Sequence, residues 1–295
     1  MKMQRIFWLI FSVMFIYAIP VAAQQPAQQP AQPPQYRQEA APVTVHRISN
    51  HVYEVRGGDG ANSAFIVGDK EVYAVDAKMS RQSGEDMVAA IKKTTDKPMT
   101  HILVTHSDGD HVIGLVGFPD SLDIVAHTNS AKHMTAANET AEEKMPLPNE
   151  IFHNQMQMAM GDLKMDLLYF GPAHTDGDIV IYLPEDEVAI IGDLFFNDRD
   201  PLIHMHKNGN SSGLASVLGK IIELDAKTFL SGHAEPVSKD EIEDLHEKII
   251  ETRKNVKALV DGGKSLDEAK MAMGISTEPS RWKSLAEVVY LELTE

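Results

Sequence analysis

The stretch 104–114, which reads VTHSDGDHVIG, constrains this chain more than any other part of it. It places His106, Asp108, Asp110 and His111 within six residues, directly after an apolar run. Such side chains at the end of a buried strand lose hydration and repel one another unless a cation lies among them. The alternative is an ordinary turn, in which Asp bonds its own backbone and Gly supplies unusual dihedral angles. A divalent metal is the simplest explanation, provided that further ligands follow downstream.

The first residues have the features of a secretory signal peptide, predicted over residues 1–23. Lys2 and Arg5 precede an apolar run of residues 6–18, and small residues lead up to Ala23. This run is short for a membrane span, which needs about 20 apolar residues, so a cleaved signal is favoured over a retained anchor. We expect a periplasmic or secreted protein with no stable membrane anchor after cleavage.

Composition and pattern divide the rest of the chain into three segments. Residues 24–43 are rich in Gln, Pro and Ala, with almost nothing to bury, and are predicted to be a disordered linker. Residues 44–237 interleave strand-like apolar runs with helical patterns, which is typical of a layered α/β domain. Residues 238–295 have mainly helical patterns and are predicted to form a C-terminal helical extension.

The expected elements begin with a meander of strands and continue with alternating helices and strands. Short β-rich runs separated by turn residues predict the meander at residues 45–48, 52–55, 64–67 and 72–75. A helix is expected at 80–95, followed by a strand at 99–104 that ends in the opening motif. The alternating methionines of 152–160 indicate either a strand face or a mobile flap, and a strand that packs on the core is favoured because Met usually fills gaps in a core.

Charge and cysteine content exclude several classes of function. The formal net charge of −16 opposes binding to nucleic acid or anionic membranes, both of which need clustered Lys and Arg. The chain has no cysteine, so disulfides, thiolate ligands and a cysteine nucleophile are excluded. Any metal must therefore be bound by nitrogen and oxygen. The expected partner is a small-molecule substrate, and the sequence does not indicate an oligomeric state.

Three later positions repeat the pattern of a strand followed by a ligand-type residue beside glycine. His174 lies in GPAHTDGD, Asp193 in a GD pair after the apolar residues 188–191, and His233 in SGH after residues 228–230. A lone His is usually structural or solvated, so each position is weak evidence by itself. Together with the opening motif they form a set of histidines and carboxylates that suits a metal centre.

In these motifs and their order, the sequence resembles the metallo-β-lactamase superfamily, whose pattern is HxHxDH, then GHTxG, GD and GH. The resemblance implies a four-layer αββα sandwich with metals on the loops at one edge. It also implies that His106 and His174 hold a first metal, that Asp110, His111 and His233 hold a second, and that Asp193 bridges the two.

One position departs from the family pattern, because Asp108 replaces the second histidine. Three outcomes are open: Asp108 binds the metal directly, it binds through water, or the first site is weak and one metal suffices. Zinc, with two ions, is the first choice for this nitrogen and oxygen ligand set. Related flavodiiron proteins carry an acidic residue at this position, so iron and manganese stay open as well.

The resemblance also implies a mechanism and a class of reaction. Zinc lowers the pKa of a bound water to about 7 and so supplies hydroxide near neutral pH. Asp110 is the expected catalytic residue, which orients the hydroxide and passes its proton to the leaving group. The expected enzyme is an exported metallo-hydrolase that cleaves an ester, thioester, lactone or β-lactam. Family enzymes with a zinc-bound Cys are disfavoured because the chain has none.

Two other classes of function stay open at this point. A non-catalytic metal-binding or scaffold protein would have a degenerate first site, and a di-iron redox protein would need an electron carrier. Metal content separates the three hypotheses, since the hydrolase should hold zinc, the redox protein iron, and the scaffold protein none after purification.

Several further residues are candidates for the surroundings of the site. Asp76 either orients a metal-binding histidine or is an ordinary turn residue. Thr175, beside His174, either plays a similar part or shapes its turn. His204 and His206 form a second HxH, which we place on a loop over the pocket, where they contact substrate at most.

Overall fold

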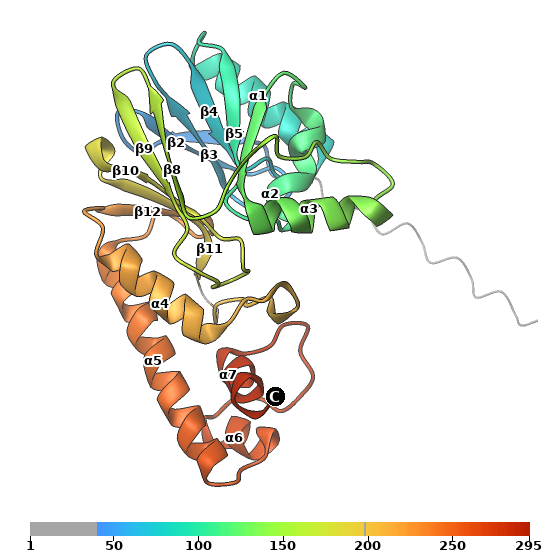
Figure 1. The fold of residues 1–295 in the computed structure, drawn as a ribbon, viewed down its shortest axis with the longest axis vertical. Helices are drawn as coiled ribbons and strands as arrows, with labels where there is room; N and C mark the ends of the chain where they lie inside the picture. Colours follow the sequence, from blue (N-terminus) through green and yellow to red (C-terminus); the bar gives the residue numbers. More distant parts are fainter. Residues whose placement is uncertain (1–39, 198) are drawn as a thin grey trace, which may run out of the picture. The chain divides into compact units, whose positions relative to one another are not determined.

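The first sheet of the protein has seven strands, and its first half is the predicted antiparallel meander (Figure 1). The computed structural model describes residues 40–197 and 199–295, so the predicted signal peptide and residues 24–39 of the predicted linker lie outside the described residues. The strands follow one another in chain order: β1 (Thr44–Arg47), β2 (Val52–Arg56), β3 (Ser63–Val67), β4 (Val72–Val75), β5 (Met99–Leu103), β6 (Asp123–His127) and β7 (Glu150–Phe152). From β4 onward the strands are parallel, because helices α1 (Arg81–Thr94) and α3 (Thr128–Thr140) form crossover connections.

The second sheet has five strands in the order β12-β11-β10-β9-β8. Their bounds are β8 (Gln155–Met160), β9 (Leu163–Leu168), β10 (Val180–Leu183), β11 (Val188–Phe196) and β12 (Thr228–His233). The pair β11 and β12 is parallel, because α4 (Ser211–Ile222) lies between these strands in the chain, and the other pairs are antiparallel.

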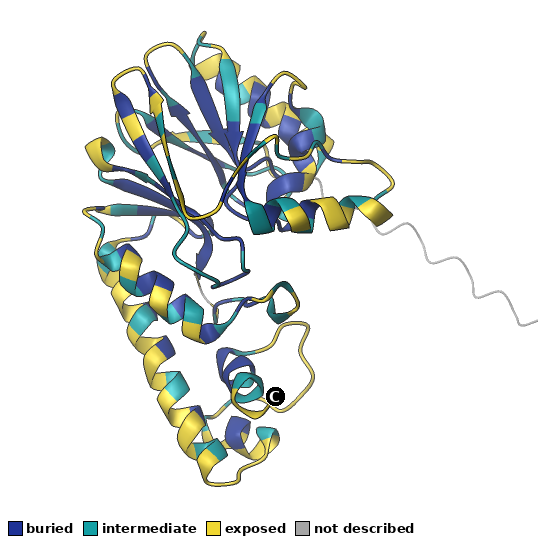
Figure 2. Ribbon diagram, in the orientation of Figure 1, coloured by how far each residue is buried: buried dark blue, intermediate teal, exposed yellow. Residues whose placement is uncertain are grey.

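Three hydrophobic clusters lie between four layers. Figure 2 shows that the strands of both sheets are largely buried. One cluster joins the first sheet to its helices through Phe65, Met87 and Met134. A second lies between the sheets, and a third joins the second sheet to the C-terminal helices through Phe229 and Leu218. The remaining helical elements are α2 (Gly109–Val112), η1 (Ile113–Gly117), η2 (Pro184–Asp186), η3 (Met205–Lys207), α5 (Lys239–Asp261), α6 (Leu266–Ala272) and α7 (Leu285–Thr294). The predicted α/β fold with C-terminal helices is confirmed.

Two predicted strands differ from the structure. The segment predicted as one strand at 152–160 is divided, because Phe152 ends β7 in the first sheet while Gln155 begins β8 in the second. The chain therefore crosses between the sheets at residues 153–154. Strand β11 runs past its predicted end at residue 191, because Gly192 adopts a positive φ of 51° at a shift of register and pairing with β12 then resumes.

The C-terminal helices share one hydrophobic cluster with the sheet. Helix α5 begins with a capping box in which Ser238 and Glu241 satisfy each other's backbone N–H groups. Val237 and Ile242, on either side of the domain boundary predicted at residue 237, lie in the same cluster as α4. At the other end, Val43 of the predicted linker packs on the first sheet. Among the described residues, no helix combines the length and apolar character needed to cross a membrane.

Candidate metal centre

The seven predicted ligands meet where strands of both sheets end. His106 and Asp108 follow β5, Asp110 and His111 lie in α2, and His174 lies in the loop between β9 and β10, while the other two are Asp193 in β11 and His233 at the end of β12. Their ligand atoms form three overlapping groups, each within 4.8 Å: His106, Asp108 and His174; Asp110, His111 and His233; and His106, His111 and Asp193. The first two groups correspond to the two predicted metal sites.

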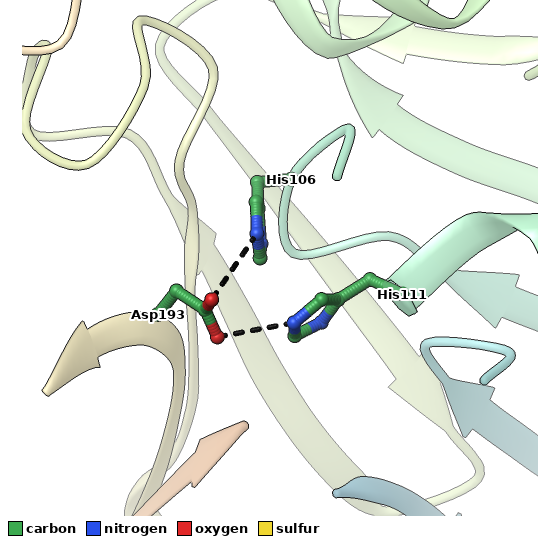
Figure 3. Close-up of side chains that lie close together, drawn as sticks. All are labelled: His106, His111 and Asp193. Carbon is green, nitrogen blue, oxygen red and sulfur yellow. Dashed lines mark ion pairs between the residues drawn. The ribbon is translucent and has the colours of Figure 1, made fainter. Parts of the chain in front are cut away.

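Asp193 lies at the centre of this arrangement. Its Oδ1 is 3.0 Å from His111 Nε2, and its Oδ2 is 3.2 Å from His233 Nε2. The same Oδ2 is 3.8 Å from Nε2 of both His106 and His174. Figure 3 shows the Asp193 carboxylate facing His106 with one oxygen and His111 with the other. One carboxylate that reaches histidines of both groups has the position that a bridging ligand requires.

The inner position of Asp193 depends on a glycine in the neighbouring strand. A Cβ atom at Gly232 would collide with Asp193 Oδ1 and would lie 2.6 Å from Cε1 of His111. Only glycine therefore fits between His233 and the rest of the centre, which accounts for the SGH motif.

Three of the histidines are oriented by hydrogen bonds from Nδ1. His111 Nδ1–H donates to Asp76 Oδ2 (2.7 Å), and His174 Nδ1–H donates to the carbonyl of Leu202 (2.7 Å). His106 Nδ1 lies 3.0 Å from Thr105 Oγ1. Because Nδ1 carries a proton in such a bond, Nε2 of each ring faces inward, where its lone pair would bind a metal in place of a proton.

Asp76 connects two of these histidines. Its Oδ1 accepts the backbone N–H of Thr105 (2.8 Å), and its Oδ2 accepts the Thr105 hydroxyl (2.7 Å) as well as His111 Nδ1–H. The Thr105 hydroxyl, having donated to Asp76, accepts from His106. Asp76 is buried and has a positive φ of 57°, so a turn conformation and the orienting contact occur together.

Thr175 shapes the loop that carries His174. Its backbone N–H and hydroxyl donate to the two oxygens of Asp178, at 2.8 and 2.5 Å. Thr175 is completely buried, and burial raises the pKa of Asp178 to about 6. The contact closes the turn after His174, which is one of the two roles predicted for Thr175.

Buried polar atoms without partners test whether a metal fits here. Among the described residues, His106 Nε2, His111 Nε2 and Asp193 Oδ1 are buried and form no well-directed hydrogen bond, although His111 Nε2 and Asp193 Oδ1 lie 3.0 Å apart. Unsatisfied buried polar atoms are rare and need an explanation. Two imidazole nitrogens and a carboxylate oxygen aimed at one point match the ligand chemistry of a divalent metal such as zinc. The residues present therefore fit the metal that the motifs imply.

The charges of the centre also favour a cation. Burial by itself lowers the pKa of His174, but its hydrogen bond to Asp108 and the charges of nearby carboxylates raise it to about 9. Burial likewise opposes ionisation of Asp193, yet His111 and the other imidazoles hold its pKa well below the usual range. The carboxylates thus retain negative charge and favour positive charge among them, carried either by protons on the imidazoles or by a bound cation.

Asp108 is held by three groups, one of which sequence analysis did not predict. Its Oδ2 lies 2.8 Å from His204 Nε2 and 3.1 Å from His174 Nε2. Its Oδ1 accepts a hydrogen bond from Lys207 Nζ at 2.6 Å, and the same ammonium donates to the backbone and side-chain oxygens of Ser107. Lys207 directly follows the predicted HxH pair in the chain. This position was the only sign in the sequence that its ammonium could lie near Asp108.

His204 therefore contacts a predicted ligand and lines the pocket, whereas His206 is not among the residues that line it. The two rings are 5.0 Å apart, and only His204 belongs to the residues that line the pocket over the centre. The contact of His204 with Asp108 goes beyond the role predicted for it.

Replacing Lys207 by methionine is expected to strengthen metal binding at the group of His106, Asp108 and His174. Removing the ammonium relieves its repulsion of a cation, while His204 still holds Asp108 Oδ2, so affinity should rise by about tenfold or more. Competitive zinc titration measures the change. Lys227→Met, which removes a surface ion pair with Glu187, is the control. Weaker zinc binding in Lys207→Met would show instead that Lys207 is needed to orient Asp108.

A pocket of about 530 Å³ opens over the centre. Its floor includes Asp110, Asp193 and His233, and its walls are formed by the remaining lining residues, Met79, Asp108, Gly109, Arg199, Leu202, His204, Arg281 and Trp282. Arg281 and Trp282 come from the segment between α6 and α7. Sequence analysis missed them because no local motif connects this segment to the ligands.

Comparison with known families and proteins agrees with this arrangement. A family model described as the metallo-beta-lactamase superfamily matches residues 56–233. The chain is 24% identical over 203 residues to the 2,4-dinitroanisole O-demethylase subunit alpha of Nocardioides sp. (strain JS1661), covering 68% of this chain and 60% of that protein. It is 23% identical over 164 residues to the metallo-beta-lactamase type 2 of Elizabethkingia meningoseptica, covering 53% and 64%. The chain thus spans less than two thirds of either relative.

Solved structures resemble the fold at low sequence identity. A metallo-beta-lactamase from Pontibacter korlensis aligns with a TM-score of 0.60 and 16% identity, covering 70% of this chain and 99% of that one. The stereoselective inverting sec-alkylsulfatase Pisa1 from Pseudomonas sp. aligns with a TM-score of 0.66 and 17% identity, covering 84% and 47%. At these identities the likeness concerns the fold alone.

Proposed function

Because the chain belongs to the metallo-β-lactamase superfamily, we propose that it is a metal-dependent hydrolase whose centre is the cluster around Asp193. The observation that supports this most is the convergence of His106 Nε2, His111 Nε2 and Asp193 Oδ1, which lie within 4.8 Å of one another, are buried and form no well-directed hydrogen bond among the described residues. When bound, a divalent metal supplies an activated water and a positive charge that stabilises the developing anion.

The roles of the protein side chains follow from their positions. Asp193 and the histidines would hold the metal, while Asp76 and Thr105 keep two imidazoles oriented. Asp110 lines the pocket, and its Oδ2 is 3.1 Å from His233 Nε2. Burial raises the pKa of Asp110, but its hydrogen bond to His233 and the charge on His111 outweigh burial and lower it. An ionised Asp110 carboxylate would accept the proton of the attacking water and deliver it to the leaving group.

The proposal extends to substrate, metal and location. We propose an ester, thioester, lactone or β-lactam as the small-molecule substrate, two zinc ions as the metals, and export by the N-terminal signal. The absence of cysteine favours the branch with Asp in place of a Cys ligand, and the charge of −16 argues against nucleic acid as a substrate. A lactam, lactone and thioester panel assayed on zinc-loaded protein identifies the substrate class.

Asp110→Ala is expected to lower the rate of hydrolysis by about 100-fold or more, because proton transfer by a positioned side chain contributes roughly 10²- to 10⁴-fold. The fold should persist, since Asp110 lies on the pocket surface of a short helix, and circular dichroism checks this. Asp162→Ala, in the exposed turn between β8 and β9, is the control. An Asp110→Ala protein with full activity would refute the proposed role.

A further inference from the structure

Two arginines face the pocket over the metal centre from different parts of the chain. Arg199 comes from the loop after β11, and Arg281 from the segment that precedes α7. Both line the same pocket as Asp110, Asp193 and His233. Neither has a role in the arrangement of ligands described above.

Each guanidinium is supported by one aromatic ring that in turn contacts a histidine of the centre. Arg199 Cζ lies 4.2 Å from the centroid of the Phe196 ring, and Phe196 stacks on His233 with centroids 5.2 Å apart and planes 13° apart. Arg281 Cζ lies 4.6 Å from the centroid of Trp282. Trp282 lies 6.2 Å from the ring of His204, which contacts Asp108. Aromatic support leaves the planar edge of a guanidinium available for a ligand.

The hydrogen-bond donors of these two arginines have no acceptor in the part of the chain that the structure describes. Within residues 40–197 and 199–295, neither Arg199 nor Arg281 forms a hydrogen bond or an ion pair. The other arginines in these ranges all donate to protein oxygens: Arg47, Arg56, Arg81 and Arg253. In a chain with a net charge of −16, two arginines without partners in one pocket indicate a site for an anion.

A neighbouring cavity offers no comparable site. It has a volume of about 460 Å³ and shares Arg199, Leu202 and Trp282 with the metal-centre pocket. The lysines that line it, Lys270 and Lys283, both lie near Glu287, at 3.5 and 3.7 Å. Their charges are therefore compensated, and of these two pockets only the one over the metal centre is lined by both Arg199 and Arg281.

We propose that Arg199 and Arg281 form an anion-binding subsite beside the metal centre. The substrate would carry a carboxylate, sulfate or phosphate group near the bond that is cleaved. The identity of the cleaved bond rests on the proposed hydrolase function, but anion binding by the two arginines does not. Bidentate hydrogen bonds from arginine to such groups would fix the register of the substrate in the pocket.

Trp282 provides a direct probe of anion binding. The chain has two tryptophans, so in a full-length Trp8→Phe protein Trp282 is the only one. Titration with sulfate, phosphate or glutarate should change its fluorescence. The anion with the lowest apparent Kd of the three is the preferred one. Arg199→Gln and Arg281→Gln should each raise the apparent Kd by about tenfold, since hydrogen bonds to charged groups are worth that much or more. Arg47→Gln, a surface change on β1, should leave the Kd as it is.

A pair of matched esters tests the consequence for the substrate. Mono-4-nitrophenyl glutarate and its methyl ester differ in one negative charge. The protein should prefer the charged ester by about tenfold or more in kcat/KM through a lower KM, and Arg281→Gln should remove most of this preference.

The outcomes separate the two proposals. Arginine-dependent anion binding by a zinc-loaded protein that hydrolyses neither the esters nor any lactam, lactone or thioester of the panel would support the subsite and refute the hydrolase. Hydrolysis of both esters with equal kcat/KM, together with anion binding that is the same in the arginine variants, would overturn the subsite and leave the hydrolase standing.

Discussion

Asp193→Ala is expected to abolish metal binding and hydrolysis together. The carboxylate faces Nε2 atoms of four histidines at 3.0 to 3.8 Å, so its loss removes a ligand from every part of the centre. Mutating a residue that hydrogen-bonds to a metal ligand typically lowers metal affinity by about 10- to 100-fold. Loss of the bridging ligand itself should therefore lower it by more than about 100-fold. Equilibrium dialysis with zinc and the hydrolysis assay measure both effects in the same sample.

Asp193→Asn shows whether the negative charge of Asp193 or only the volume of its side chain is needed for zinc binding. The amide fills the same volume beside Gly232 but carries no negative charge, so it should also bind zinc poorly. Asp166→Asn, in strand β9 and bonded to Gln157 on the surface, is a matched control that should bind zinc normally. Zinc content equal to that of the wild type in both Asp193 variants would contradict a bridging role for this carboxylate.

Asp76→Ala is expected to give the largest loss of stability of any single change near the centre. It leaves the Thr105 N–H, the Thr105 hydroxyl and His111 Nδ1 without their shared acceptor. Breaking a buried polar network of this kind costs about 3–5 kcal/mol in the free energy of unfolding. Alanine would also have to adopt the positive φ of 57°, which is unfavourable for it. The melting temperature should fall by roughly 10 °C.

Asp76→Asn distinguishes the contribution of the left-handed backbone conformation from that of the hydrogen bonds that orient His111 and Thr105. Asparagine tolerates the left-handed conformation, so it should lose less stability than alanine. Its amide has one acceptor oxygen in place of two and cannot accept all three hydrogen bonds from Thr105 and His111, so zinc affinity should still fall by about 10- to 100-fold. Thermal unfolding, monitored by circular dichroism, measures the loss of stability, and equilibrium dialysis with zinc measures the loss of affinity. An Asp76→Ala protein that melts at the wild-type temperature would exclude Asp76 as a support of the centre.

The sequence was most informative where ligands follow strand ends. His174 and His233 each come after an apolar run, and the ends of such strands meet at one edge of the fold, so their convergence with His106 could be predicted. The meander and the layered class followed from the same patterns. The ligand roles assigned to these residues are still predictions, since the geometry supports them without a bound metal.

Features that depend on packing between distant segments could not be predicted. The contact of Lys207 with Asp108 spans 99 residues of the chain, and no local pattern encodes it. Arg281 and Trp282 reach the pocket only because the C-terminal helices pack against the second sheet. The division of residues 152–160 between two sheets has the same origin, because alternation of apolar residues does not indicate which sheet a strand joins.

Hydrolysis measured against zinc equivalents shows whether the reaction depends on a metal at the centre around Asp193. Full-length protein is stripped with a chelator, zinc is added in fractions of an equivalent, and hydrolysis of the most reactive substrate of the panel is followed together with bound zinc. The account predicts no hydrolysis in the stripped protein, a rise with added zinc, and saturation when the sites around Asp193 are filled. Hydrolysis that is unchanged by stripping, or tight zinc binding that never restores it, would contradict a metal-dependent hydrolase.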